Sequence, residues 1–171
     1  MAISEVDEEV NDYDWFAVDK DGRVGHFTTG GMGTMPRTVA ASWDDLLVIT
    51  NFFTKTLPLT TEARLDPKAQ RAANDVDWRK GWTSPMDAEA ALAHCFKYFV
   101  QMASRGLYSF DHSYALDHTK PRTRPCPLYY RIAIPRIPLH VTGLSLNIQT
   151  ILNRTILANA NFSNDDEVRV E

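Results

Sequence analysis

The sequence contains little cysteine, and no stretch of it is long and apolar enough to cross a membrane. Cys95 and Cys126 are the two cysteines among 171 residues, whereas small secreted domains normally carry several cysteines in pairs. A membrane-spanning helix needs about 18 or more consecutive apolar residues. The first residues, MAISEVDEEVNDYD, are acidic where a secretory signal would be basic and then apolar. These absences predict a cytoplasmic protein that has no disulfide and does not enter a membrane.

Basic residues are missing or outnumbered at both ends of the chain. Residues 1–14 contain six acidic side chains and no basic one, the last seven residues have a net charge of −3, and the middle of the chain carries about +5. Acidic ends keep a protein in solution, and they also attract a basic partner. Phosphate binding requires a concentrated basic face, so nucleic acid is not expected as a partner. Residues 1–12 are expected to form an acidic, flexible terminus.

Established ion-binding and nucleotide-binding motifs are also missing, most visibly from WFAVDKDGRVGHFTTGGMGTMP, residues 15–36. A calcium-binding loop aligned on DKDG would have Ala17 and Thr28 where two essential oxygen ligands belong. The glycines of GGMGTMP lack the lysine and the spacing of a phosphate-binding loop. Neither a GxSxG nor an HExxH motif occurs in the chain. The stretch therefore predicts a β-hairpin followed by a glycine hinge over Gly30–Gly33, and no cofactor is expected.

The pattern that is present predicts a single α+β domain over residues 1–171, with a mainly antiparallel sheet and two principal helices. Aromatic and β-branched residues on both sides of the DKDG turn predict the hairpin. Ser42 caps a helix of about 43–55, and Ser84 begins a longer helix that Gly106 ends. The remaining segments predict a short helix over 67–74, strands within 107–116 and 127–135, a short helix within 143–154, and closing strands within 155–162 and 167–170.

Two Asp-His pairs lie six residues apart, at Asp111, His112, Asp117 and His118. Zinc accepts imidazole and carboxylate ligands, so His112, Asp117 and His118 are candidate metal ligands. The spacing matches no established zinc motif, however, and polar residues around a hairpin loop are the alternative interpretation. His26 and His140 are isolated in the sequence and are expected to be structural.

Two tryptophans, Trp78 and Trp82, stand in a charged segment. They either pack against the core, which is the commoner environment of a large apolar side chain, or they mark a contact surface. The second alternative makes them the candidate partner-binding residues.

Three stretches of the chain carry a resemblance: DWFAVDKDGRVGHFTTGG, SRGLYSFDH, and YYRIAIPRIPLHV leading into LSLNIQTIL. Together they resemble a group of small, uncharacterised bacterial proteins of similar length, and the first hairpin is the most specific part. Some proteins of this kind resemble immunity proteins of bacterial toxin systems. The resemblance implies an α+β fold and a bacterial, cytoplasmic origin, and it implies no active-site residues.

Two hypotheses of different classes follow. The first is a non-enzymatic protein-interaction module, immunity-like, whose acidic or aromatic surface holds a protein partner such as a toxin. It ranks ahead because the sequence has no catalytic motif. The second is a small metal-dependent enzyme that uses the Asp-His pairs at 111–118.

Overall fold

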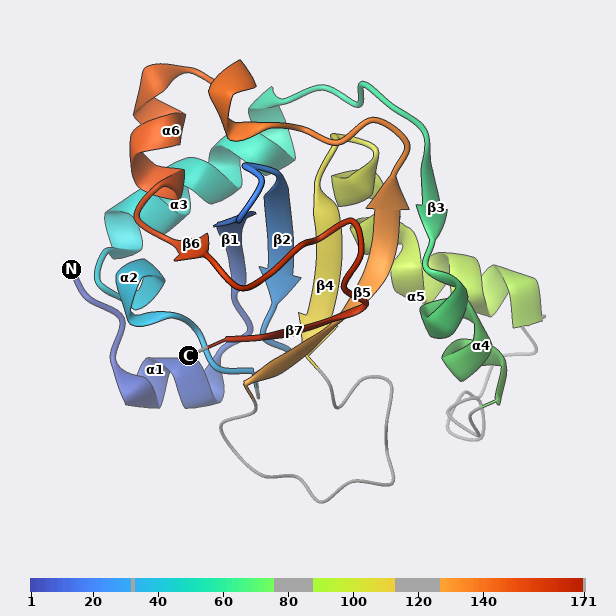
Figure 1. Ribbon diagram of the computed structural model, residues 1–171. Coiled ribbons are helices and arrows are strands. Elements are labelled where there is room, and N and C mark those ends of the chain that lie inside the picture. Colours follow the sequence, from blue (N-terminus) through green and yellow to red (C-terminus); the bar gives the residue numbers. More distant parts are fainter. Residues whose placement is uncertain (32, 76–87, 113–126, 171) are drawn as a thin grey trace.

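A mixed sheet of seven strands forms the centre of the molecule (Figure 1). The structure is a computed structural model, and it describes residues 1–31, 33–75, 88–112 and 127–170. The strands lie in the order β3-β5-β4-β2-β1-β6, and β7 also pairs with β5. Their bounds are β1 Asp14–Asp19, β2 Val24–Thr28, β3 Ala63–Leu65, β4 Tyr108–His112, β5 Leu128–Pro135, β6 Ile156–Leu157 and β7 Glu167–Arg169.

Antiparallel pairs outnumber parallel ones in this sheet. Strand β1 pairs with β2, and β5 with β3, β4 and β7, in the antiparallel sense. The β1–β6 and β2–β4 pairs are parallel. The predicted single α+β domain with a mainly antiparallel sheet is therefore confirmed. The helices are α1 Glu5–Val10, α2 Arg37–Ala40, α3 Trp43–Asn51, α4 Pro67–Asp75, α5 Ala88–Ala103 and α6 Leu146–Leu152, with a π-helical turn over Phe52–Thr56 and a 3₁₀ turn over Val141–Gly143.

The predicted hairpin is confirmed as β1 and β2. Gly22 in the DKDG turn has a φ of 84°, a conformation that glycine adopts without steric cost. The buried carboxylate of Asp19 accepts hydrogen bonds of 2.9 Å from the backbone N–H groups of Asp21 and Arg23. It also accepts one of 2.9 Å from the N–H of Phe162, far along the chain. An acid of the turn thus shapes the backbone and fastens the C-terminal segment to the hairpin.

The two principal helices follow the predicted pattern. The hydroxyl of Ser42 accepts a hydrogen bond of 3.2 Å from the N–H of Asp45 at the start of α3, and the helix continues through the π-helical turn to Thr56. Helix α5 ends at Ala103, before Gly106, and its predicted start at Ser84 lies outside the described residues. The shorter predicted elements are also found, as α4, β4, β5, α6, β6 and β7.

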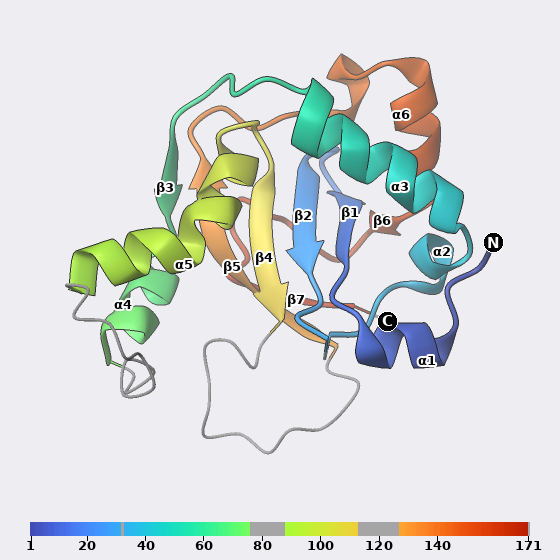
Figure 2. The same ribbon diagram turned by 180° about the vertical axis from the view of Figure 1, so that it is seen from behind.

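The two faces of the sheet are covered differently (Figures 1 and 2). Helix α5 packs on β3, β4 and β5, and α3 packs on β1, on what we call the helix face. On the opposite side, the tail face, the segment from β6 to β7 crosses the sheet (Figure 1). Residues of one strand alternate between the two faces, so each strand contributes to both layers.

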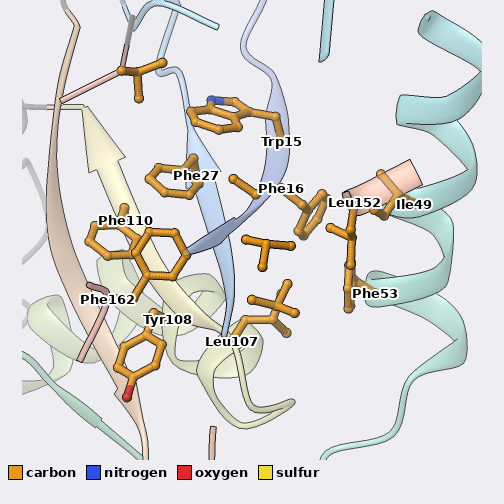
Figure 3. Packing of buried hydrophobic residues seen from close by; sticks show 14 of the residues in the cluster. Trp15, Phe16, Phe27, Ile49, Phe53, Leu107, Tyr108, Phe110, Leu152 and Phe162 are labelled. Carbon is orange, nitrogen blue, oxygen red and sulfur yellow. The ribbon is translucent and has the colours of Figure 1, made fainter. Parts of the chain in front are cut away.

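The tail face is filled with aromatic rings (Figure 3). Trp15 stacks on Phe27 with 4.1 Å between ring centroids, and Phe27 stacks on Phe110 with 4.8 Å. Phe162 of the C-terminal segment closes this stack, with its ring centroid 5.3 Å from that of Phe110. On the helix face, Phe16 lies against Phe53, with 4.7 Å between ring centroids.

The predicted elements did not include strand β3, helices α1 and α2, the 3₁₀ turn over Val141–Gly143 or the two parallel strand pairs. Helix α1 lies within the acidic terminus and begins with a capping box of Ser4 and Asp7. Ile3 is buried, and its N–H donates to the carbonyl of Ala40 at 2.7 Å. The terminus therefore has a regular structure that packs on α2, and its flexibility stays a prediction.

Candidate functional site

The first Asp-His pair is divided between the two faces of the sheet. Asp111 and His112 are consecutive residues of β4, so their side chains point to opposite sides. Asp117 and His118 lie outside the described residues, as does Cys126. Among the described residues, no group of three or more histidine, cysteine, aspartate or glutamate side chains is arranged to hold a metal ion. The hypothesis of a metal-dependent enzyme stays a prediction that depends on the second pair.

The glycine segment that follows the hairpin packs against His112. Gly30 has a φ of 55°, and a Cβ atom there would come within 2.5 Å of the imidazole, so a larger residue would be both strained and obstructed. The carboxylate of Asp12 accepts hydrogen bonds from the N–H of Gly30 at 2.6 Å and from the hydroxyl of Thr29 at 3.2 Å. Burial lowers the pKa of His112. The glycines thus allow a close approach to the sheet, and motion of the predicted hinge stays a prediction.

A chain of polar side chains, with a buried histidine and serine at one end, lies on the helix face. His26 Nδ1 lies 2.7 Å from the hydroxyl of Ser109, and His26 Nε2 lies 3.1 Å from Asp14 Oδ1. The hydroxyl of Tyr98 on α5 donates a hydrogen bond of 2.5 Å to Asp14 Oδ2. An ionised carboxylate can only accept, so in the neutral imidazole Nε2 carries the hydrogen and Nδ1 accepts from Ser109. We call these four residues the polar chain; it joins β1, β2, β4 and α5.

The carboxylates around the polar chain have pKa values that are shifted in opposite directions. Burial raises the pKa of Asp14, but the hydrogen bond and charge of His26 and the hydroxyls of Tyr98 and Thr28 outweigh it, so the pKa lies below its usual value. Burial raises the pKa of Asp111 to about 8, and the charges of Asp12 and Asp14 add to this effect, although the N–H of His112 opposes it. At neutral pH, Asp14 is therefore ionised, whereas Asp111 is mostly protonated.

Serine hydrolases activate their nucleophile with the same three groups in the same order, a hydroxyl, an imidazole and a carboxylate. In this protein, however, the side chains of His26 and Ser109 are both 0% exposed. A substrate cannot reach a nucleophile that is completely enclosed. His26 is consistent with its predicted structural role, because both of its ring nitrogens have protein partners. The polar chain links a helix to three strands.

No pattern in the sequence indicates that the four residues of the polar chain form a unit. Ser109 and His26 are 83 positions apart, and they meet because β2 and β4 pair in parallel with His26 opposite Ser109. His140, the other isolated histidine, lies beside the hairpin turn, where its Nε2 is 2.8 Å from the carbonyl oxygen of Asp21. Its predicted structural role agrees with this position.

The second candidate site is an exposed apolar arc on α3. Trp43, Leu47 and Val48 are 42%, 47% and 43% exposed, and at 100° per residue they lie within one arc of about 140° together with Asp44. The buried side of the helix carries Leu46, Ile49 and Phe53. Single exposed apolar residues are common on protein surfaces, but a contiguous group is typical of a contact surface.

The N-terminal segment lies against the first turn of α3, at Trp43 and Asp44. The N–H of Trp43 donates to the carbonyl of Met1 at 2.7 Å, and the terminal ammonium of Met1 lies 3.3 Å from the carboxylate of Asp44. The ring of Tyr13 meets the Trp43 indole edge to face, with centroids 6.0 Å apart. Burial raises the pKa of Tyr13, and the negative charges of Asp7 and Glu8 on α1 raise it further.

We call the combined region the α1–α3 surface: Tyr13, Trp43, Asp44, Leu47 and Val48 with the four acids of α1, Glu5, Asp7, Glu8 and Glu9. Sequence reasoning identified Trp43 as part of a helix but not as exposed. The tryptophans that it proposed for partner binding, Trp78 and Trp82, lie outside the described residues. The helical spacing of Trp43 and Leu47 was the available signal, because it sets them apart from the buried stripe.

Two further findings bear on function. Within the described residues, no helix has the length and apolar character required to span a membrane. Comparison of the chain with protein-family models, with curated proteins and with solved structures gives no match. The residues themselves therefore have to support any functional proposal.

Proposed function

We propose that this chain is a non-enzymatic protein-binding module of the bacterial cytoplasm, immunity-like, and that it holds its partner on the α1–α3 surface. The observation that supports the proposal is the exposure of Trp43, Leu47 and Val48 on one arc of a helix whose other side is buried. Exposed aromatic and aliphatic side chains of this kind are the usual anchors of protein interfaces. A toxin encoded next to the gene is the first partner to test.

The fold provides a rigid base for such a surface. Helix α3 is capped by Ser42 and packs its opposite side into the core, and the guanidinium of Arg154 pairs with Asp45 on its first turn. Trp43 is held by Met1 and Tyr13 and so loses little freedom when a partner covers it. The hydroxyl and imidazole of the polar chain, on Ser109 and His26, are enclosed and out of reach of a substrate, and this favours binding over catalysis.

The test compares a double variant of the surface with a matched control. Trp43→Ala combined with Leu47→Ala should weaken binding to the protein encoded next to the gene by about 2 kcal/mol or more, because buried aromatic anchors dominate interface energies. Isothermal titration calorimetry measures the affinities. Ile137→Ala removes an apolar side chain as large as that of Leu47, 66% exposed, and should leave the affinity unchanged.

Thermal unfolding must show that the double variant remains folded, which is expected because both side chains face solvent. An affinity that the double variant leaves unchanged, or that Ile137→Ala lowers as strongly, would overturn the proposal. If the partner is a toxin, co-expression of the wild-type chain should protect cells from it, and co-expression of the double variant should not.

A further inference from the structure

We propose that the partner of the α1–α3 surface presents a basic face, with an arginine or lysine side chain lying over the indole of Trp43 between Asp44 and the acids of α1. This inference rests on the proposed function and names the chemistry of the partner. It depends on the charge, the aromatic groups and the exposure that the structure brings together at this place.

The charged side chains of α1 are all negative. Helix α1, EVDEEV, carries four acids and no base. None of the ion pairs found between described residues involves an acid of α1, and Asp44 pairs only with the terminal ammonium of Met1. The charge of Glu5 raises the pKa of Glu8, to a smaller extent than burial does, so the acids repel one another. A basic partner would relieve this repulsion, which no cation of the described chain does.

The aromatic groups add a second attraction for a cation. Trp43 is the side chain best suited to a cation–π contact, since tryptophan binds cations more strongly than the other aromatic residues. Its exposed indole has Tyr13 against it and Asp44 next to it in the helix. A guanidinium can stack on an indole and pair with a carboxylate at the same time. Arginine therefore fits the surface better than a neutral side chain does.

The same charges disfavour the other possible occupants. Nucleic acid and anionic lipid headgroups would bring negative charge against α1. A second copy of the chain that used the same surface would place acid against acid. A partner with a neutral apolar face would bury the acids of α1 without pairing them, which costs free energy. A basic protein face is the occupant that complements both parts of the surface.

The experiment uses the full chain and defined peptide probes. A short peptide of alternating arginine and glycine is titrated into the ¹⁵N-labelled protein, with matched lysine–glycine and glutamate–glycine peptides as comparisons. We expect the arginine peptide to shift the indole N–H signal of Trp43 and the amide signals of α1, the lysine peptide to do so more weakly, and the glutamate peptide not to do so. Raising the salt concentration from well below to above the physiological value should lower the affinity of the arginine peptide about tenfold, because salt screens exposed charges.

Three variants locate the effect. Glu5→Gln combined with Glu9→Gln removes charge from α1 and should lower the affinity of the arginine peptide severalfold. Glu167→Gln removes an exposed acid from β7 and should leave that affinity unchanged. Trp43→Ala should abolish the preference for arginine over lysine. Signal shifts centred on the acidic C-terminal segment, or equal weakening by Glu167→Gln, would overturn the inference.

The proposed function can survive that failure. If the Trp43 and Leu47 double variant loses its protein partner while no basic peptide binds the surface, the surface is an interface for a partner of other chemistry. In that case the inference about basic character is wrong and the proposed function stands. If Trp43→Ala changes neither the binding of the peptides nor the binding of the protein partner, the inference and the proposed function are both wrong.

Discussion

Trp15, Phe27 and Phe110 stack across three neighbouring strands on the tail face, whereas Phe16, His26 and Ser109, the residues next to them in those strands, point to the helix face. The three strands thus build an apolar layer on one side and a partly polar layer on the other. A shift of one residue in strand register would exchange the two sets.

The two faces are specified in different ways. Burial of stacked aromatic rings stabilises the fold in many different arrangements of the rings, because the hydrophobic effect has no preferred direction. A buried imidazole, hydroxyl and carboxylate are satisfied only in one arrangement, since each unpaired polar group costs free energy. We infer that the tail face supplies most of the stability and that the helix face fixes the register of β1, β2 and β4.

The largest expected effect is the loss of Phe27. Its ring contacts those of Trp15, Phe110, Tyr129 and Phe162. Phe27→Ala should lower the free energy of unfolding by about 3–5 kcal/mol, because the cavity is enclosed by rings from four other segments. Chemical denaturation followed by circular dichroism measures the change.

Phe27→Leu is the matched control for that variant. It keeps most of the volume and removes the stacking, so it should cost less than half as much as alanine. A cost below about 1 kcal/mol for Phe27→Ala would show that the tail face collapses around the gap and contributes little to stability.

The next effect is expected on the helix face. Ser109→Ala leaves His26 Nδ1 buried without its 2.7 Å partner, and should lower the free energy of unfolding by about 1–3 kcal/mol. Changing His26 to leucine in the same chain removes the unpaired group. The double variant should therefore cost less than the sum of the two single variants in a denaturation experiment. Additive costs would show that the polar chain does not act as a unit.

Local signals in the sequence predicted the elements that short segments determine. The DKDG turn, the Ser42 cap and the glycine after α5 each act within a few residues of the structure that they specify. Strand β3 has three residues, too few for an alternating pattern to be recognised. Helix α1 has six residues, which is short for a helix, and its many acids were interpreted as a sign of solvation.

The candidate sites depend on contacts between distant segments, and these could not be predicted. The polar chain needs the parallel pairing of β2 with β4, which no turn between them specifies. The α1–α3 surface needs Met1 and Tyr13 to lie against Trp43, contacts made across 42 and 30 positions. The acids of the terminus were recognised as an attraction for a basic partner, but the tryptophan beside them was not.

The smallest expected effect concerns pH and sharpens the contrast within the helix face. The pKa of Asp111 is about 8 in the folded protein and 3.8 in a model compound, so ionisation is less favourable in the folded state. The stabilising contribution of the protonated carboxyl is present in full below about pH 4 and is lost as the pH rises to about 8. Asp111→Asn should remove this dependence. The stability of the wild-type chain relative to Asp111→Asn should therefore fall between pH 4 and 8 and then become constant.

Denaturation of both proteins at several pH values measures that difference. The contributions of the other titrating groups are the same in both proteins and therefore cancel. A shift of about four pKa units sets an upper limit of about 6 kcal/mol on this change. Only a small part of it should be measured, because Asp111 is not fully buried and water screens its charge. A constant difference at all pH values would contradict the raised pKa of Asp111. A fall in the difference would show that β4 carries an acid that is still mostly protonated at neutral pH in the folded protein.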